Sequence, residues 1–203
     1  MELIDTQEQL RDHYGVLHPL AVRKVHARLD DFCRRFIALS PFVVVASFDA
    51  EGRADASPRG DAPGFVRIVD DVTLLIPDRP GNNRVDSFGN IVSTGRVGLL
   101  FLVPGLNDAL RVNGGARVTA DNSFLQLDSV AGKLPRGGLL VSVEEAFFHC
   151  GKAVMRSQLW ATGSQVPKDS FPGIGRIISE QLKEGDPAEL ERAVEEESKT
   201  TLY

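Results

Sequence analysis

Residues Leu74–Arg84 read Leu-Leu-Ile-Pro-Asp-Arg-Pro-Gly-Asn-Asn-Arg, an apolar run that ends at a proline and leads into a turn rich in arginine and asparagine. The apolar run is typical of a buried strand. Arginine offers a fixed fork of donors that fits a phosphate or a carboxylate in bidentate fashion. Gly81 lets a ligand approach the backbone, and Asn82 can cap a following helix, whose free N–H groups favour an anion. The chemistry leaves two interpretations open: a solvated turn with two surface arginines, or a phosphate-binding turn between a strand and a helix.

The length and composition indicate one globular domain. The chain has 203 residues, of which 42% are hydrophobic and 25% charged, as in ordinary soluble proteins. We expect helices in residues 1–40, a barrel with its associated helices in residues 42–160, and a helical tail in residues 170–203. The formal net charge of −5 argues against a general nucleic-acid binder. Any anionic ligand therefore needs a local cluster of basic residues.

The cysteines and the apolar runs indicate where the protein works. Cys33 and Cys150 do not make a disulfide framework, so we expect a reducing, cytoplasmic environment. The acidic start of the chain does not resemble a secretory signal. The longest apolar runs, Phe42–Ala46 and Leu99–Val103, are too short to cross a membrane. We expect a soluble protein that binds neither a membrane nor nucleic acid.

The first 40 residues have the pattern of two helices. Asp5–Glu8 has the spacing of a capping box, and Gly15 is a natural stop, which predicts a short first helix. A second helix is predicted to run without a break from Pro19 to Ser40, before Pro41. Its apolar face would consist of Val22, Val25, Leu29, Phe32, Cys33 and Phe36.

From Phe42 onward the pattern is mainly that of strands. Phe42–Phe48 is predicted to be a strand buried on both faces. Gly114-Gly115 suggests a strand with a bulge or with a close approach by a ligand. Asp121 can cap one helical turn, and Asp186 starts a final helix. Further strands are expected at 53–59, 65–69, 72–76, 97–103, 110–119 and 139–148, and a short helix at 83–93 with Val85, Phe88, Ile91 and Val92 inward. Six or more strands with short connections predict a mainly β fold with flanking helices, an antiparallel sheet curled into a barrel.

Three stretches are candidates for a binding site. They are Ser57–Asp61 at a strand end, the turn Arg79–Arg84, and His149–Trp160. If the third stretch is helical, Lys152, Arg156 and Trp160 are spaced by four and share one face. Such a face can clamp a phosphate and cover a planar ring. The alternative is an amphipathic helix with its basic side in water and Trp160 in the core.

Other chemistries have weaker support in the sequence. The four histidines and two cysteines lack the spacing of zinc ligands, so no metal site is predicted. Cys150 as a nucleophile would need a base and a raised thiolate fraction, and we expect a buried, inert thiol instead. The chain contains no G-x-S-x-G motif, no Walker A motif and no G-x-G-x-x-G after a strand, which disfavours serine hydrolases, P-loop enzymes and Rossmann dehydrogenases.

The order of these motifs resembles a known family. The run from Phe42 to Thr119 is similar to the FMN-binding split barrel of the pyridoxamine 5′-phosphate oxidase family. The matching parts are Asp49–Gly52, Ser57–Gly60, Val72–Ile76 with its basic turn, Arg96–Phe101 and Gly114–Ala116. Three runs further resemble a bacterial subgroup of FMN-dependent flavoproteins: P-D-R-P-G-N-N-R, L-R-V-N-G and H-C-x-K-A-x-x-R-S-x-L-W.

The resemblance implies an FMN-binding split barrel and a homodimer with FMN at the subunit interface. By position, Ser57 and Arg59 would line the flavin from a strand end. Asn83 and Arg84 would bind the FMN phosphate, with Arg79 and Asn82 beside them. Lys152, Arg156 and Trp160 would approach from the partner subunit. The acidic tail from Glu189 to Glu197 lacks the family's substrate-gripping segment, which counts against vitamin B6 oxidation.

The leading hypothesis is therefore an FMN-dependent oxidoreductase that acts on a small-molecule substrate or electron donor. Because the flavin carries the redox step, no catalytic side chain is named. A non-catalytic module that stores or senses FMN is the alternative. A haem- or flavin-reductase partner is a further one, since one fold hosts several ligands.

Overall fold

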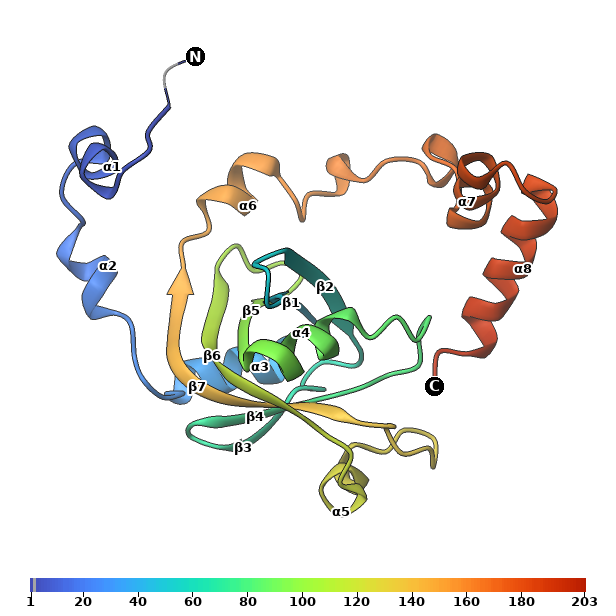
Figure 1. Ribbon diagram of the computed structural model, residues 1–203, viewed down its shortest axis with the longest axis horizontal. Coiled ribbons are helices and arrows are strands. Elements are labelled where there is room, and N and C mark those ends of the chain that lie inside the picture. The colour runs from blue at the N-terminus through green and yellow to red at the C-terminus, as the bar shows by residue number, and fades with distance from the viewer. Residues whose placement is uncertain (2) are drawn as a thin grey trace.

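The centre of the structure is a seven-stranded antiparallel sheet with the strand order β2-β1-β5-β6-β7-β4-β3 (Figure 1). The computed structural model describes residue 1 and residues 3–203. The strands are β1 (Phe42–Phe48), β2 (Ala54–Gly60), β3 (Arg67–Asp70), β4 (Thr73–Pro77), β5 (Arg96–Leu102), β6 (Ala109–Thr119) and β7 (Gly138–His149). The predicted fold class, a mainly β split barrel with flanking helices, is confirmed, although the sheet does not close into a complete barrel.

The core lies on the inner face of this sheet. The side chains of Val43, Val45 and Phe101 are completely buried, and Ile37 and Ile91 pack against the same cluster from two helices. On the outer face of β1, Ala46 and Phe48 are exposed. The prediction that β1 is buried on both faces is therefore wrong for a single chain, because no described element covers this end of the strand.

The predicted bulge in β6 is confirmed, and it explains why residue 114 is a glycine. The register of β6 against β7 shifts between Asn113 and Gly114. A Cβ atom at Gly114 would lie 1.9 Å from the carbonyl oxygen of Ser142. The close approach of two backbones at the bulge therefore excludes any side chain at this position.

The N-terminal region contains three helices where two were predicted. They are α1 (Gln7–Tyr14), α2 (Pro19–Arg23) and α3 (Asp31–Leu39). The capping box of α1 joins Thr6 and Gln9, one residue later than predicted. The continuous second helix is wrong for two reasons: His26 pairs with Ala146 of β7 through two backbone hydrogen bonds, and Asp30 caps α3 by accepting from the Cys33 N–H. Consequently, Val22 and Phe32 are exposed.

The remaining helices flank the sheet or follow it. The α-helices are α4 (Asp86–Thr94), α5 (Asn122–Leu125), α6 (Lys152–Ser157), α7 (Ile174–Leu182) and α8 (Pro187–Thr200). The 3-10 turns are η1 (Gln126–Asp128), η2 (Thr162–Ser164) and η3 (Lys168–Ser170). Asp121 and Asp186 cap α5 and α8 as predicted. In α4, Phe88 and Ile91 face inward as expected, whereas Val92 and the preceding Val85 are exposed. Helix α7 lies in the segment 170–203 that was expected to be helical, although only the final helix from Asp186 was predicted individually.

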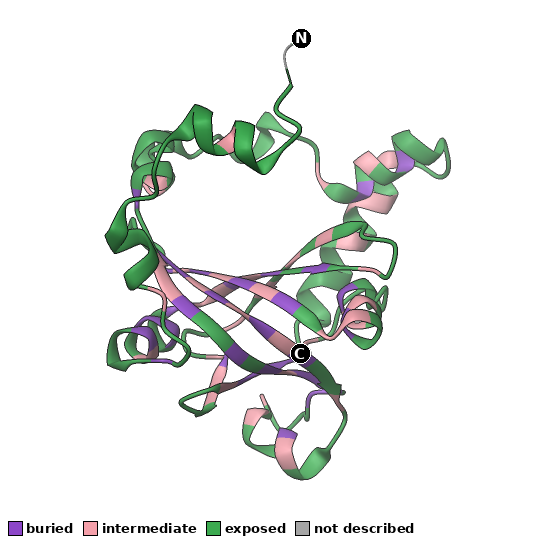
Figure 2. Cartoon of the chain, turned by 60° about the vertical axis from the view of Figure 1, so that its left-hand side comes forward, coloured by how far each residue is buried: buried purple, intermediate pink, exposed green. Residues whose placement is uncertain are grey.

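Both ends of the chain extend away from the sheet (Figures 1 and 2). Helices α1, α2, α6 and α8 bury no residue, and the segment next to the N-terminus is mainly exposed in Figure 2. The tail returns at Tyr203, whose hydroxyl donates to Asp61 over 2.6 Å and whose carbonyl oxygen accepts from Lys133 Nζ over 2.7 Å. Across the described part of the chain, no helix is long and apolar enough to span a membrane.

Candidate functional site

The inner face of β2 carries a row of polar side chains. Asp55, Ser57 and Arg59 alternate with exposed neighbours and are themselves half-buried. The predicted alternation of this strand is confirmed, and its polar side faces the protein. Ser87 of α4 donates to Asp55 over 2.8 Å. The first turn of α4 therefore packs against a polar strand face.

Arg59 lies at the end of β2, close to the end of β4. Its guanidinium donates to the Ser57 hydroxyl and, over 2.9 Å, to the Pro58 carbonyl. Asp78 directly follows β4 and is half-buried. Burial raises the pKa of Asp78, and the positive charges of Arg59 and Arg136 act in the opposite direction on it. Two arginines, one from the end of β2 and one from the loop before β7, thus lie near one half-buried carboxyl group.

Arg136 lies near Asp78 because it lies just before the start of β7. The Asp78 N–H donates to the Gly137 carbonyl over 2.9 Å, which fixes the two loops side by side. Arg136 Nη1 donates to Asn83 Oδ1 over 3.0 Å. We call the group Ser57, Arg59, Asp78, Asn83 and Arg136 the basic site. The structure brings together three predicted residues, Ser57, Arg59 and Asn83, and adds two that sequence reasoning missed.

The loop before α4 has an unusual backbone. Asn83 and Val85 have positive φ angles of 55° and 50°. A left-handed conformation is costly for a β-branched residue such as valine, and such strain concentrates at functional sites. Asn82 Oδ1 accepts from the Arg84 N–H over 3.1 Å. The prediction that Asn82 caps the next helix is wrong, because Val85 occupies the cap position and no side chain from the described residues caps α4.

Arg84 and Arg79 have different environments. Arg84 is exposed and pairs with Asp86, with 2.7 Å between Nε and Oδ2. Arg79 is mostly buried: its Nε lies 2.6 Å from Asp61 Oδ2, and its Nη1 donates to the Asp128 carbonyl over 2.8 Å. Arg84 is therefore available at the rim of the basic site, whereas Arg79 is held in an ion pair that stabilises the fold.

The third candidate stretch does not form one helical face. Helix α6 ends at Gln158, which has a φ of 51°. Trp160 lies in the turn beyond it and donates its Nε1–H to the Leu106 carbonyl over 2.8 Å. Lys152 and Arg156 are on α6 and exposed. The prediction of a single stripe through Trp160 is wrong, because the helix stops two residues earlier.

Lys152 and Arg156 follow the end of β7 opposite to the one that Arg136 precedes. Arg136 precedes β7 and α6 follows it, and the 12 residues of β7 separate the two ends by up to about 40 Å of strand. Cys150 is exposed in the turn between β7 and α6. Our expectation of a buried thiol is wrong, because the strand ends at His149 and leaves Cys150 outside the sheet.

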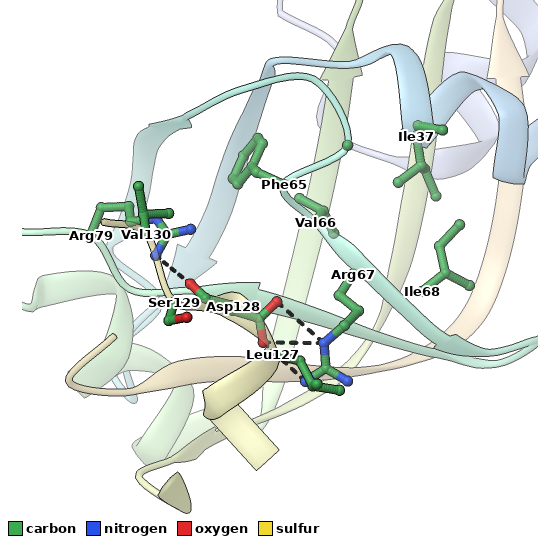
Figure 3. Close-up of a pocket in the computed structure, with 12 residues that line it drawn as sticks. Ile37, Phe65, Val66, Arg67, Ile68, Arg79, Leu127, Asp128, Ser129 and Val130 are labelled. Atoms are coloured by element: carbon green, nitrogen blue, oxygen red, sulfur yellow. Dashed lines mark hydrogen bonds and ion pairs between the residues drawn. The ribbon is translucent and has the colours of Figure 1, made fainter. Parts of the chain in front are cut away.

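Two cavities lie outside the basic site. One, of about 410 Å³, is lined by residues of α3, the segment Gly64–Ile68, Arg79 and the segment Leu127–Val130 (Figure 3). The other, of about 270 Å³, lies on β1, β5 and β6 around Phe48 and Arg96. Among the described residues, no group of three or more His, Cys, Asp or Glu side chains is arranged to hold a metal ion.

The family described as Pyridoxamine 5′-phosphate oxidase matches residues 29–150. Because this match covers more than half of the 203 residues, the chain belongs to the pyridoxamine 5′-phosphate oxidase family, as its motifs predicted. The matched segment contains the whole sheet and the basic site. The N-terminal helices α1 and α2 and everything from α6 onward lie outside it.

Comparison with curated proteins gave no match. Among solved structures, HupZ from Group A Streptococcus is 18% identical, with a TM-score of 0.49 over 59% of this chain and 93% of that chain. General Stress Protein 26 from Bacillus anthracis is 12% identical, with a TM-score of 0.42 over 56% and 88%. HutZ from Vibrio cholerae, described as a heme storage protein, is 17% identical, with a TM-score of 0.42 over 61% and 94%.

Proposed function

We propose that this protein is an FMN-dependent oxidoreductase whose basic site binds the FMN phosphate. The observation that supports this most directly is the convergence of Arg59, Arg136 and Asn83 at the end of β4. The protein as a whole is acidic, with a formal net charge of −5. A local group of cations beside a strained loop in such a protein suits an anion.

The donor set of the basic site fits a phosphate group. Guanidinium groups bind phosphate in bidentate fashion, and Arg59, Arg136 and the exposed Arg84 supply three of them within a short stretch of surface. Helix α4 begins without a side-chain cap among the described residues, and the N–H groups of an uncapped first turn favour an anion. Asp78, within the basic site, opposes a phosphate, and burial raises its pKa.

A second copy of the chain completes the proposed site. Lys152 and Arg156 lie at the end of β7 opposite to Arg136, and no contact joins them to the described residues of the basic site. Both side chains are exposed, and α6 buries no residue. We propose a homodimer in which α6 and Trp160 of one chain approach the flavin bound by the other. The unburied helices at both ends of the chain suit this assembly, because helices with no buried face gain most of their stability from packing.

The flavin, when bound, supplies the redox chemistry. The chain's own residues hold the phosphate, orient the ring and shape the space for a small-molecule substrate or electron donor. A pocket completed by two chains would exclude water from the ring better than one open surface.

FMN titration of the purified protein, followed by flavin fluorescence, tests the proposal. We expect Arg59→Gln or Arg136→Gln to weaken FMN binding by about 10- to 100-fold, because each removes a charged hydrogen bond worth roughly 1.5–3 kcal/mol. Arg117→Gln is the matched control, since Arg117 is exposed on β6, outside the basic site. Equal affinities for all three variants and the wild type would show that the phosphate binds elsewhere.

Turnover separates the oxidoreductase from a module that only stores or senses FMN. Stopped-flow mixing of the FMN complex with NADH or NADPH should bleach the flavin absorbance if the protein is an oxidoreductase that uses these donors. Bound FMN that stays oxidised with every donor tested favours the storage module. Haem binding would appear as a new absorbance band near the violet end of the spectrum. If the protein binds haem and does not bind FMN, both flavin functions are excluded.

A further inference from the structure

The larger cavity has apolar walls and a charged end (Figure 3). Its volume of about 410 Å³ falls within the range of small-molecule sites. The apolar walls come from Ile37, Phe65, Val66, Ile68, Leu127 and Val130. At the charged end, Figure 3 shows Asp128 between Arg67 and Arg79.

The two arginines are held rigidly. Arg67 Nε donates to both carboxylate oxygens of Asp128, over 3.2 and 3.1 Å, and its Nη2 donates to the Phe124 carbonyl over 2.7 Å. The Phe124 ring also covers the guanidinium, with 4.6 Å between the ring centroid and Cζ. Arg79 is fixed by its bonds to Asp61 and to the Asp128 carbonyl. Groups with locked rotamers lose little entropy when they bind a ligand.

At the charged end of the cavity, the side-chain groups that remain unpaired can all donate hydrogen bonds. Asp61 already accepts from Arg79, from the Tyr203 hydroxyl and from the Ala62 N–H, and both oxygens of Asp128 accept from Arg67. Within the described chain, Arg67 Nη1, Arg79 Nη2 and the Ser129 hydroxyl have no hydrogen-bond partner. A ligand that brings acceptors to this end of the cavity would find all three groups able to donate to it.

We propose that this cavity binds a small carboxylate with an apolar or aromatic body. The carboxylate would accept from Arg79 and Ser129, which border the cavity together with Arg67, in charge-assisted hydrogen bonds. The body would lie against Phe65 and Ile68, away from water. The cavity shares no residue with the basic site, so this ligand site is distinct from the one proposed for the FMN phosphate.

Titration of the ¹⁵N-labelled protein with benzoate, followed by amide chemical shifts, tests the proposal. We expect saturable shifts concentrated in 64–68 and 127–130. Benzamide has the same ring without the charge, and it should bind about tenfold more weakly if the arginines recognise a carboxylate. Shifts concentrated around Arg59 and Arg136 instead, or equal binding of benzamide, would overturn the proposal.

A blocking variant gives an independent test. Ser129→Trp places a large side chain at the cavity wall and should abolish the benzoate shifts. Gln126→Trp adds the same side chain on the neighbouring turn η1, at an exposed residue outside the lining, and should leave them unchanged. Unaltered benzoate binding by Ser129→Trp contradicts the proposal. If that variant does not fold, the wild-type shift map alone decides.

Discussion

The hydroxyl of Ser87 donates a hydrogen bond to Asp55 Oδ2 over 2.8 Å and so joins α4 to the inner face of β2. Ser87 is only 2% exposed, so water does not replace this partner. One helical turn later, Asn90 Nδ2 donates to the Ser47 hydroxyl of β1 over 3.0 Å. These two bonds fix the position of α4, and with it the strained loop that carries Asn83 and Val85 beside Arg59.

Replacement of Ser87 should therefore destabilise the protein. Ser87→Ala leaves the half-buried Asp55 carboxylate without this donor, and we expect the free energy of unfolding to fall by about 1–2 kcal/mol. Urea denaturation measures this change in the free energy of unfolding. Ser93→Ala on the same helix is the control, because Ser93 is exposed and bonds only to the Gly89 carbonyl of its own helix. Equal losses in both variants would mean that the Asp55 bond contributes nothing specific.

Local patterns predicted the sheet because each strand is either an apolar run or an alternation of period two, with turn residues between the strands. The hairpin of β1 and β2 and the bulge at Gly114 follow from such local signals. The break between α2 and α3 was missed because Val22, Val25 and Leu29 keep a helical spacing across it. What interrupts the helix is the pairing of His26 with Ala146, a contact 120 residues away in the sequence that no local pattern contains.

The candidate site was only half predictable for the same reason. Arg59 and Asn83 lie in motifs that resemble a known family, whereas Arg136 sits in a loop without a pattern and reaches Asn83 across 53 residues. Asp78 belongs to the quoted run, but its partial burial depends on the neighbouring loops. Trp160 does not lie on the predicted helical face because Gln158 adopts a left-handed conformation that ends the helix. No glycine or proline at that position indicated the end of the helix in the sequence.

The two thiols should differ strongly in reactivity. Cys33 is 2% exposed, and burial, followed by its hydrogen bond with Asp30, raises the pKa of its thiol to about 11. At pH 8 the reactive thiolate is therefore nearly absent at Cys33, whereas Cys150 is exposed. We expect Ellman's reagent to modify one thiol per native chain quickly and both after denaturation. Cys150→Ser should remove the fast reaction; a fast reaction that persists in this variant would show that Cys33 is accessible.

The Arg79–Asp61 ion pair should stabilise the fold in a pH-dependent way. Burial alone would raise the pKa of Asp61, but hydrogen bonds from Tyr203, Ala62 and Arg79 together lower it below its ordinary value of 3.8. A lowered folded-state pKa stabilises the protein above the unfolded-state pKa, and this contribution is lost as the pH falls through the folded-state pKa. Asp61→Asn should therefore cost about 2–3 kcal/mol at pH 7.

Denaturation of the wild type and Asp61→Asn across a pH series measures this effect. The difference between the two proteins should shrink as the pH falls below 3.8 towards the folded-state pKa. Asp86→Asn is the control, because the Arg84–Asp86 pair is exposed and such pairs contribute little. A cost for Asp61→Asn that is the same at every pH would exclude ionisation of Asp61 as its cause.

Removal of the charge at Asp78 should act in the opposite direction. Burial raises the pKa of Asp78 against the pull of Arg59 and Arg136, so its ionised form costs folding free energy at pH 7, and this cost disappears as the pH falls through the folded-state pKa. Asp78→Asn should therefore stabilise the protein at pH 7. It should also tighten FMN binding by roughly 1 kcal/mol, about fivefold, because a negative charge beside the phosphate is removed.

Denaturation and FMN titration at pH 7 check both effects of Asp78→Asn. Glu51→Gln is the matched control for net charge, because Glu51 is exposed in the turn before β2, at the end of that strand opposite Arg59. It should leave FMN affinity unchanged. If Asp78→Asn weakened FMN binding instead, Asp78 would have to hold Arg59 and Arg136 in place for the phosphate, and its role would be to position the arginines rather than to oppose the ligand.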